Sequence, residues 1–182
     1  MIKIAILLAD GFEEAEALVP ADLLLRAGAD VKLVSVSGRE TVVGSHGFRI
    51  GTDIPFEEVN AEDLDLLMLP GGKVGTDNLA SDKRVSALLQ EVVKKGKYLA
   101  CICAAPSVPG RLGLLAGKKF TCYPGFEKYA TGGIHTGAPV EIDGRFVTAE
   151  GMGVADEFGF AIISLLFGKE KSDSIRVSVR KS

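Results

Sequence analysis

The chain has 182 residues, of which 47% are hydrophobic and 25% are charged. This composition is that of an ordinary globular protein, so it excludes a disordered chain or a fibrous repeat, and the length predicts one domain spanning residues 1–182. The formal net charge of −3 argues against a nucleic-acid or anionic-membrane partner. No segment approaches the roughly 18 consecutive apolar residues that a membrane span requires.

Strand-like apolar runs alternate with helix-like runs along the chain. The first run, residues 2–8, leads straight into Asp10 without a small-residue cleavage site, so it predicts a strand and not a signal peptide. Apolar periodicity, capping residues and glycines mark the helices. The predicted strands are residues 2–8, 31–36, 64–69 and 98–103; the predicted helices are residues 13–27, 81–95 (with Ser81 as N-cap) and 155–167; the predicted hairpins are residues 40–50 and 140–149, and the last ten residues are expected to fray.

Near-continuous apolar strands separated by helices are typical of a mostly parallel sheet that is covered on both faces. We therefore predict an α/β sandwich with short hairpin excursions. In open sheets of this kind, functional residues gather at the carboxyl ends of the strands. Four turns satisfy this rule, namely residues 9–16, 70–75, 103–106 and 149–155.

The three cysteines, Cys101, Cys103 and Cys122, are odd in number and form no CxxC pair. They indicate neither a disulfide framework nor a zinc site, and a reducing cytoplasm is the simplest location for them. Nothing in the sequence implies a metal or an organic cofactor.

Cys103 is the first candidate for chemistry. It ends a buried-looking strand and precedes the small residues Ala104 and Ala105, a pattern that can hold a nucleophile above a sheet. The N-terminus of the following helix is expected to lower the pKa of the thiol. The alternative is a buried structural cysteine, which is common in folded proteins.

Two further turns offer partners for this cysteine. Gly71 and Gly72 end a strand where backbone N–H groups can point at a developing oxyanion, although Pro-Gly turns are also common without a function. Glu16 is flanked by apolar residues, so it is the least solvent-like acid of the first turn and a candidate proton shuttle. The alternative is that these acids only complement the helix dipole. Pro20 removes a helical partner of residue 16, which predicts a kink or bulge at Glu16.

These motifs together resemble the ThiJ/PfpI family, in the subgroup of the Parkinsonism-associated protein deglycase and its bacterial relatives. The resemblance covers nearly the whole chain and rests on three segments in the right order, LADGFEEAEA, LPGGKVGTDNL and ICAAP. It implies a flavodoxin-like (Rossmann-like) three-layer sandwich, a homodimer, and no cofactor. It also implies that Cys103 is a low-pKa nucleophile, that Glu16 is its carboxylic partner, and that the backbone around Gly72 and Ala104 supplies oxyanion donors.

The chain departs from the family pattern at several positions. Family proteases place a histidine directly after the cysteine, where this chain has Ala104, so a protease or amidotransferase-like activity is disfavoured. His135 comes one residue later than the histidine of many relatives, and strand alternation can turn it away from Cys103. His46 and Glu150 stand where relatives often have arginines, which puts a shared anionic ligand in doubt.

Three functions follow from the resemblance. The first is a cofactor-independent glyoxalase or deglycase that acts on methylglyoxal-like α-oxoaldehydes, with His135 as a further catalytic candidate and His46 and Glu150 as pocket candidates. The second is a sensor of oxidants through oxidation of Cys103. The third is a chaperone-like holding protein, for which replacing Cys103 by alanine would leave the function intact.

Overall fold

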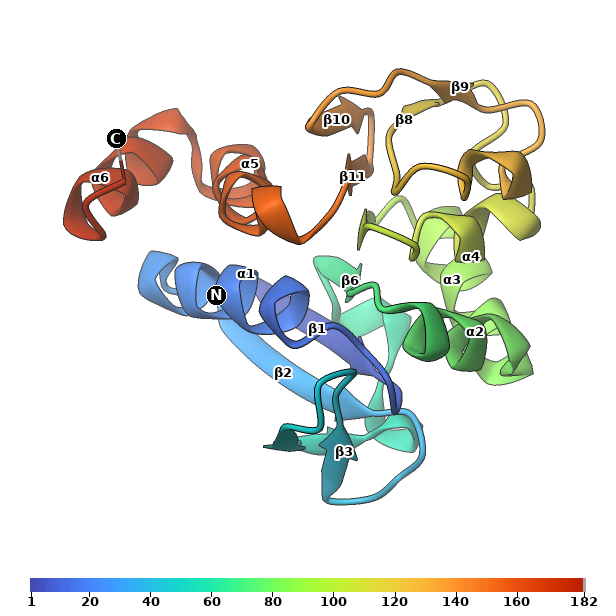
Figure 1. The fold of residues 1–182 in the computed structure, drawn as a ribbon. Helices are drawn as coiled ribbons and strands as arrows, with labels where there is room; N and C mark the ends of the chain where they lie inside the picture. The colour runs from blue at the N-terminus through green and yellow to red at the C-terminus, as the bar shows by residue number, and fades with distance from the viewer. Residues whose placement is uncertain (182) are drawn as a thin grey trace.

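The computed structural model describes residues 1–181, and its centre is a seven-stranded sheet with the order β10-β11-β7-β6-β1-β2-β5 (Figure 1). Neighbouring strands are parallel except β10, which runs antiparallel to β11. The strands are β1 Lys3–Leu8, β2 Asp30–Ser35, β3 Thr41–Val43, β4 Arg49–Gly51, β5 Ile54–Pro55, β6 Leu66–Leu69, β7 Tyr98–Ile102, β8 Lys119–Phe120, β9 Ile134–His135, β10 Val140–Asp143 and β11 Phe146–Ala149. The helices are α1 Glu14–Ala27, α2 Lys73–Ser81, α3 Lys83–Lys94, α4 Ser107–Arg111, α5 Ala155–Phe167 and α6 Lys169–Ser178.

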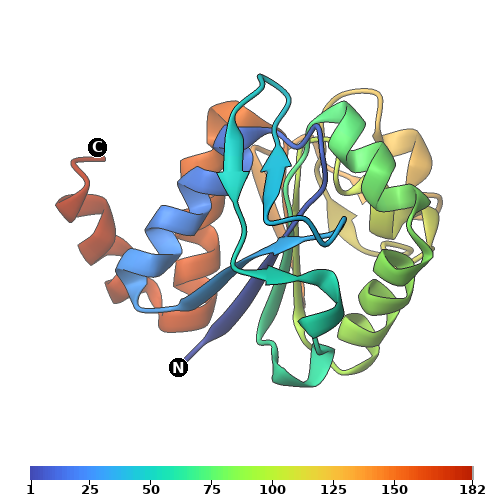
Figure 2. The same ribbon diagram turned by 90° about the horizontal axis from the view of Figure 1, so that it is seen from below.

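Helices cover both faces of this sheet, as predicted. Figure 2 shows α1, α5 and α6 on one side and α2, α3 and α4 on the other. Each side has its own core, in which alternate residues of the strands pack against the helices; Ile6 faces α1 and α5, whereas Leu7 faces α3. Every residue of β6 is buried, because a strand covered on both faces needs apolar side chains on both. The fold is therefore the flavodoxin-like α/β sandwich.

Both predicted hairpins are present. Strands β3 and β4 form a separate two-stranded sheet that projects beyond the carboxyl ends of the main strands (Figure 2). The second hairpin, β10–β11, extends the main sheet because β11 pairs in parallel with β7. A third small sheet joins β8 and β9.

Helix α1 differs from the prediction at Glu16. It runs as unbroken α-helix from Glu14 to Ala27 through Pro20, so the predicted bulge is wrong. Pro20 is buried against α5, where Gly159 lets the two helices approach closely: a Cβ at Gly159 would lie 3.2 Å from Pro20 Cα. We attribute the regular helix to this packing, which compensates for the one backbone hydrogen bond that proline removes.

Two helices were not predicted. Helix α2 follows Gly72 directly, in a segment whose glycines and polar residues indicated only a turn. Helix α6 includes residues 173–178 of the last ten residues, which were expected to fray; Ser182, the last of them, lies outside the described residues. The helix is held by the Ser172 hydroxyl, which donates to the Phe160 carbonyl at 3.0 Å, and by the burial of Ile175. Among residues 1–181, no helix combines the length and the apolar character needed to cross a membrane.

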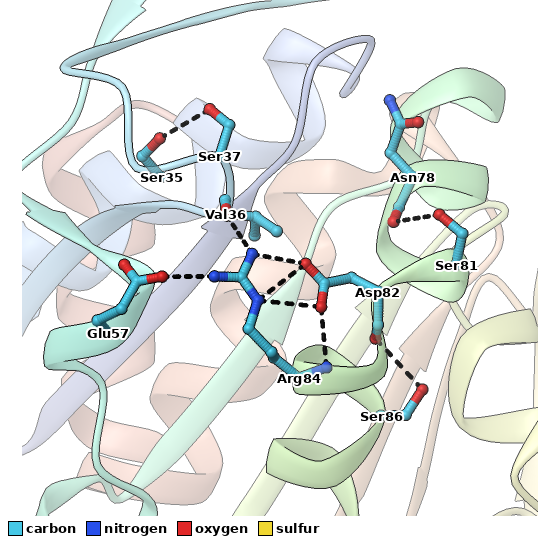
Figure 3. A network of polar contacts seen from close by, with 9 residues as sticks. All are labelled: Ser35, Val36, Ser37, Glu57, Asn78, Ser81, Asp82, Arg84 and Ser86. Carbon is cyan, nitrogen blue, oxygen red and sulfur yellow. Dashed lines mark hydrogen bonds and ion pairs between the residues drawn. The ribbon is translucent and has the colours of Figure 1, made fainter.

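The cap of α3 is Asp82 and not the predicted Ser81, because α2 continues through Ser81. The Asp82 carboxylate accepts from the Arg84 backbone N–H at 2.8 Å and pairs with the Arg84 guanidinium, which also donates to the Val36 carbonyl (Figure 3). The Ser81 hydroxyl only donates to the Asn78 carbonyl.

This cap gives a direct test by chemical denaturation. Asp82→Ala is expected to lower the free energy of unfolding by ~1 kcal/mol, because an orphan N–H of α3 loses its acceptor. The matched control Ser81→Ala is expected to cost less. Equal losses in the two variants would contradict the assignment of Asp82 as the cap.

Candidate active site

Cys103 lies immediately after β7, at the carboxyl edge of the sheet. Its backbone adopts the left-handed conformation with φ of 63°. Its N–H donates to the Ala149 carbonyl at 2.9 Å, and its carbonyl accepts from the Tyr123 N–H at 2.9 Å. Left-handed backbone is unfavourable for any residue with a Cβ, so these bonds hold Cys103 in a strained turn that ends the strand.

Glu16 lies on α1 beside this turn, and its side chain is 1% exposed. Its carboxyl oxygen Oε2 accepts from the Gly71 N–H at 2.9 Å, and the carboxyl also accepts from the Met152 N–H and is hydrogen-bonded to the Cys103 thiol. Burial raises the pKa of Glu16 to about 7, although these hydrogen bonds oppose the shift. The structure thus brings together the two residues that the sequence paired.

The environment of the Cys103 sulfur differs from the expectation. Burial, followed by the negative charge of Glu16, raises the pKa of the Cys103 thiol to about 12 when Glu16 is ionised, while the backbone N–H groups of Gly72 and Ala104 donate to the sulfur and oppose this shift. The prediction that the N-terminus of α4 lowers the pKa of the Cys103 thiol is therefore wrong when Glu16 is ionised. Helix α4 has only five residues, and burial has the larger effect on this pKa.

Gly71 and Gly72, which follow β6, direct their N–H groups at different partners. The N–H of Gly71 is occupied by Glu16, so the prediction of Gly71 as an oxyanion donor is corrected; Gly72 and Ala104 direct their N–H groups at the sulfur. Gly71 also lacks room for a side chain: a Cβ there would clash with Glu16 Oε2 and lie 2.7 Å from Cys103 Cβ. At Gly72, which has φ of 86°, a Cβ would clash with the Gly11 carbonyl oxygen.

His46 lies in the first hairpin and is held by two acids of the first turn. Its Nδ1 lies 2.9 Å from a carboxylate oxygen of Glu14 and 3.5 Å from one of Glu13. Burial alone would raise the pKa of Glu14, but hydrogen bonds from His46 and Ser45 lower it to about 2. The hydrogen bond to Glu14 and the two negative charges raise the pKa of His46.

These three side chains are also the arrangement within residues 1–181 that comes nearest to a metal site. One ligand atom from each of Glu13, Glu14 and His46 lies within 4.8 Å of the others. The same atoms are engaged in hydrogen bonds with one another and with Ser45, so we assign them no metal.

Glu150 directly follows β11 and lines a surface pocket of about 310 Å³. The other lining residues are Tyr123, Pro124, Gly151, Met152, Gly153 and Val154. Tyr123 is bonded to the Cys103 carbonyl and Met152 to the Glu16 carboxyl, so this pocket adjoins the cysteine–carboxyl pair. Met152 lies in the turn 149–155 that the carboxyl-edge rule selected, but the sequence analysis singled out neither Met152 nor Tyr123 as a site residue.

His135 is exposed on β9, where its ring lies 5.5 Å from that of Phe120, measured between centroids. Among the described residues, no hydrogen bond joins His135 to Cys103 or Glu16. The structure therefore provides no contact through which His135 would serve as a base for Cys103.

A strained cysteine, a buried carboxyl group and two backbone N–H donors at the carboxyl edge of a flavodoxin-like sheet define a class of α/β proteins that hold one cysteine in the turn after a central strand. Comparison with known sequences agrees with this class. The model of the DJ-1/PfpI family matches residues 2–165, and the chain belongs to this family.

Several members of the family show the extent of the similarity. Protein DJ-1 homolog B of Arabidopsis thaliana is 40% identical over 172 residues, which are 93% of this chain but only 39% of that protein, so the chain spans less than half of this relative. The glutathione-independent glyoxalase DJR-1.2 of Caenorhabditis elegans is 35% identical over 165 residues, covering 90% of this chain and 87% of the relative. A crystal structure of a cysteine-to-alanine mutant of a DJ-1 superfamily protein from Salmonella typhimurium superposes with a TM-score of 0.95 at 31% identity over 100% of both chains.

Proposed function

We propose that this protein converts small α-oxoaldehydes such as methylglyoxal into 2-hydroxy acids without a cofactor, with Cys103 as the nucleophile. The observation that carries this proposal is the hydrogen-bonded pair of Cys103 and buried Glu16, with the N–H groups of Gly72 and Ala104 directed at the sulfur. The similarity to a protein named as a glyoxalase supports the same reaction class.

The pair supplies both a nucleophile and a proton carrier. Two ionised groups in hydrogen-bond contact repel each other, so the pair loses its protons in two separate steps. The first loss is centred near the Glu16 pKa of about 7, and the second near the Cys103 pKa of about 12. Between these values the pair holds one negative charge, and a thiolate formed within it accepts a hydrogen bond from the neutral Glu16 carboxyl.

The reaction then balances with groups already in place. The thiolate adds to the aldehyde carbon, and the oxygen takes a proton to give a hemithioacetal. Glu16 removes the hydrogen on that carbon as a proton and returns a proton to the neighbouring carbonyl carbon, so the electron pair moves within the substrate and a thioester results. Water cleaves the thioester and releases the 2-hydroxy acid and the Cys103 thiol. In this proposal, the N–H groups of Gly72 and Ala104 stabilise the negative oxygen that forms beside the sulfur.

The test is lactate formation from methylglyoxal by purified protein. Wild type is expected to turn over, and Cys103→Ala to fall to the rate without protein, with its fold confirmed by circular dichroism. Absence of turnover in the folded wild type, or equal turnover in the variant, would overturn the proposal.

The same surroundings favour a second candidate, a sensor of oxidants. A sulfinate at Cys103 would accept hydrogen bonds from the donors that now point at the sulfur and from a protonated Glu16. This function requires peroxide to add two oxygen atoms to Cys103, detected by intact-protein mass, in a protein without aldehyde turnover. A Cys103 that peroxide leaves unmodified would exclude it.

The homodimer and the cytoplasmic location belong to this proposal as well. The free thiols of Cys101, Cys103 and Cys122 suit a reducing compartment. Val19 and Leu25 leave apolar side chains exposed on α1, as Phe48 does between β3 and β4, which suits contact with a second copy. Analytical ultracentrifugation measures the assembly directly.

A further inference from the structure

The pocket beside Cys103 is small and has mainly uncharged walls. Its volume of about 310 Å³ lies at the lower end of the range for small-molecule sites. Tyr123, Met152 and Val154 supply aromatic and apolar surface, and Gly151 and Gly153 supply backbone. The walls are fixed to the reactive pair by the hydrogen bonds from Tyr123 to Cys103 and from Met152 to Glu16. The pocket therefore adjoins the backbone turn that carries Cys103, and Cys103 and Glu16 lie behind its lining residues.

Glu150 is the charged residue of this lining. Its backbone N–H donates to the Pro139 carbonyl at 3.0 Å, which places it at the start of the turn after β11. Within residues 1–181, its carboxylate has neither an ion-pair partner nor a side-chain hydrogen bond, although the residue is partly buried. A partly buried carboxylate without a partner is stabilised when a cation binds beside it.

The other charges near the pair do not offset Glu150. Glu14 is paired with His46, and Glu13 adds a further negative charge that is felt at Glu16. Among residues 1–181, no lysine or arginine lines the pocket. The side-chain charges on this side of the molecule that His46 does not offset, those of Glu13 and Glu150, are therefore negative, which attracts cations and repels anions.

We infer that Glu150 is a specificity-determining residue that selects carbonyl compounds carrying a positive charge, such as α-oxoaldehydes with an ammonium or guanidinium group, over anionic ones such as glyoxylate. This inference rests on the proposed function for the identity of the reaction, but the charge selection itself concerns access to Cys103. It is therefore measurable without any turnover.

The experiment measures alkylthiolation of Cys103 by three methanethiosulfonate reagents that differ in charge: trimethylammonium-ethyl, sulfonato-ethyl and methyl. Rates are followed by intact-protein mass, and each is divided by the rate with free 2-mercaptoethanol, which removes the intrinsic reactivity of the reagent. Cys103→Ala identifies any labelling of Cys101 or Cys122. Wild type is expected to prefer the cationic over the anionic reagent by about tenfold at low salt, and less at high salt.

Variants assign this preference to Glu150. Glu150→Gln is expected to reduce the cation-to-anion ratio at least threefold, and Glu150→Lys to reduce it further. Glu58→Gln, which makes the same change in net charge at an exposed position near the amino end of β1, is expected to keep the wild-type ratio. A ratio near one in wild type, or an equal fall in Glu150→Gln and Glu58→Gln, would overturn the inference.

The two proposals fail in different ways. If Cys103 prefers the cationic reagent but the protein does not convert methylglyoxal, the inference about Glu150 stands and the proposed reaction is contradicted. If methylglyoxal is converted and phenylglyoxal and 4-carboxyphenylglyoxal give equal kcat/KM, the reaction stands and Glu150 is not a specificity determinant.

Discussion

Between pH 4 and pH 8, wild type will lose about 3 kcal/mol of its free energy of unfolding through Glu16, and Glu16→Gln will not show this loss. The same variant will turn over substrate more slowly. The stability effect follows from the raised pKa of Glu16, about 7 in the fold against 4.5 for the free group. Between these values the folded state binds more protons than the unfolded state, so wild-type stability falls as the pH rises. Glutamine carries no proton to lose, and this fall is absent from the variant.

The measurement is urea denaturation of wild type and Glu16→Gln at pH 4, 5.5, 7 and 8. The difference between them should grow up to about pH 7 and then level off. Cys103→Ala is the control: it should keep the fall in stability with rising pH, because burial is the leading cause of the raised pKa of Glu16 and the hydrogen bond from Cys103 opposes it. If the difference in free energy of unfolding between the two proteins did not change with pH, the pKa of Glu16 would not be raised in the folded protein.

The same variant should lose a factor of about 10² to 10⁴ in turnover of methylglyoxal, which is the usual contribution of a positioned acid–base group. In wild type, turnover should rise as the pH passes about 7, where the pair acquires its negative charge. This limb should shift or vanish in Glu16→Gln. A rate and a pH profile equal to those of wild type would exclude Glu16 as the proton carrier.

Gly71→Ala will disrupt the site while leaving the fold in place. The added Cβ would clash with Glu16 Oε2 and lie 2.7 Å from Cys103 Cβ, so it must push the carboxyl and the thiol apart. We expect turnover to fall at least 100-fold, since small misplacements of reacting groups have such effects. The free energy of unfolding should fall by about 1–3 kcal/mol, as for other overpacked interiors.

Gly51→Ala is the matched control for this variant. A Cβ added at Gly51 would meet no atom of residues 1–181 within 4 Å, and the backbone there is not left-handed, so turnover should be unchanged. Activity is measured as lactate release, and the hydrogen bond between Glu16 and Cys103 is followed by the pH dependence of thiol alkylation. Full activity in Gly71→Ala would contradict the close approach of Gly71 to Glu16 and Cys103.

Local pattern predicts the scaffold well in this protein. Apolar runs such as β1 and β6 define buried strands without ambiguity, and the carboxyl-edge rule then places Cys103 and Gly72 side by side. The apolar neighbours of Glu16 correctly indicated its burial. The errors lie where long-range contacts decide the outcome: α6 is polar in sequence, and its burial against α5 is what keeps it helical.

The finer chemistry of the site was less accessible from sequence. Whether Gly71 or Gly72 faces the sulfur depends on which N–H the Glu16 carboxyl occupies, and that carboxyl comes from a helix more than fifty residues away. The roles of Tyr123 and Met152 arise from backbone groups, which leave no signature in residue type. The position of His135 depends on a two-residue strand that pattern alone does not reveal.

The left-handed backbone at Cys103 has a consequence for how this protein evolves. Glycine accepts such a conformation freely, and one nucleotide change converts a cysteine codon into a glycine codon. Mutation to glycine would therefore relieve about 1 kcal/mol of local strain and remove the thiol in a single step. Because glycine also loses more backbone entropy on folding, the two residues are close to balanced for stability at this turn, and a lineage that keeps cysteine does so for the sulfur. If cysteine is retained at this position in sequenced variants, the thiol has a function, and this conclusion requires no knowledge of the substrate.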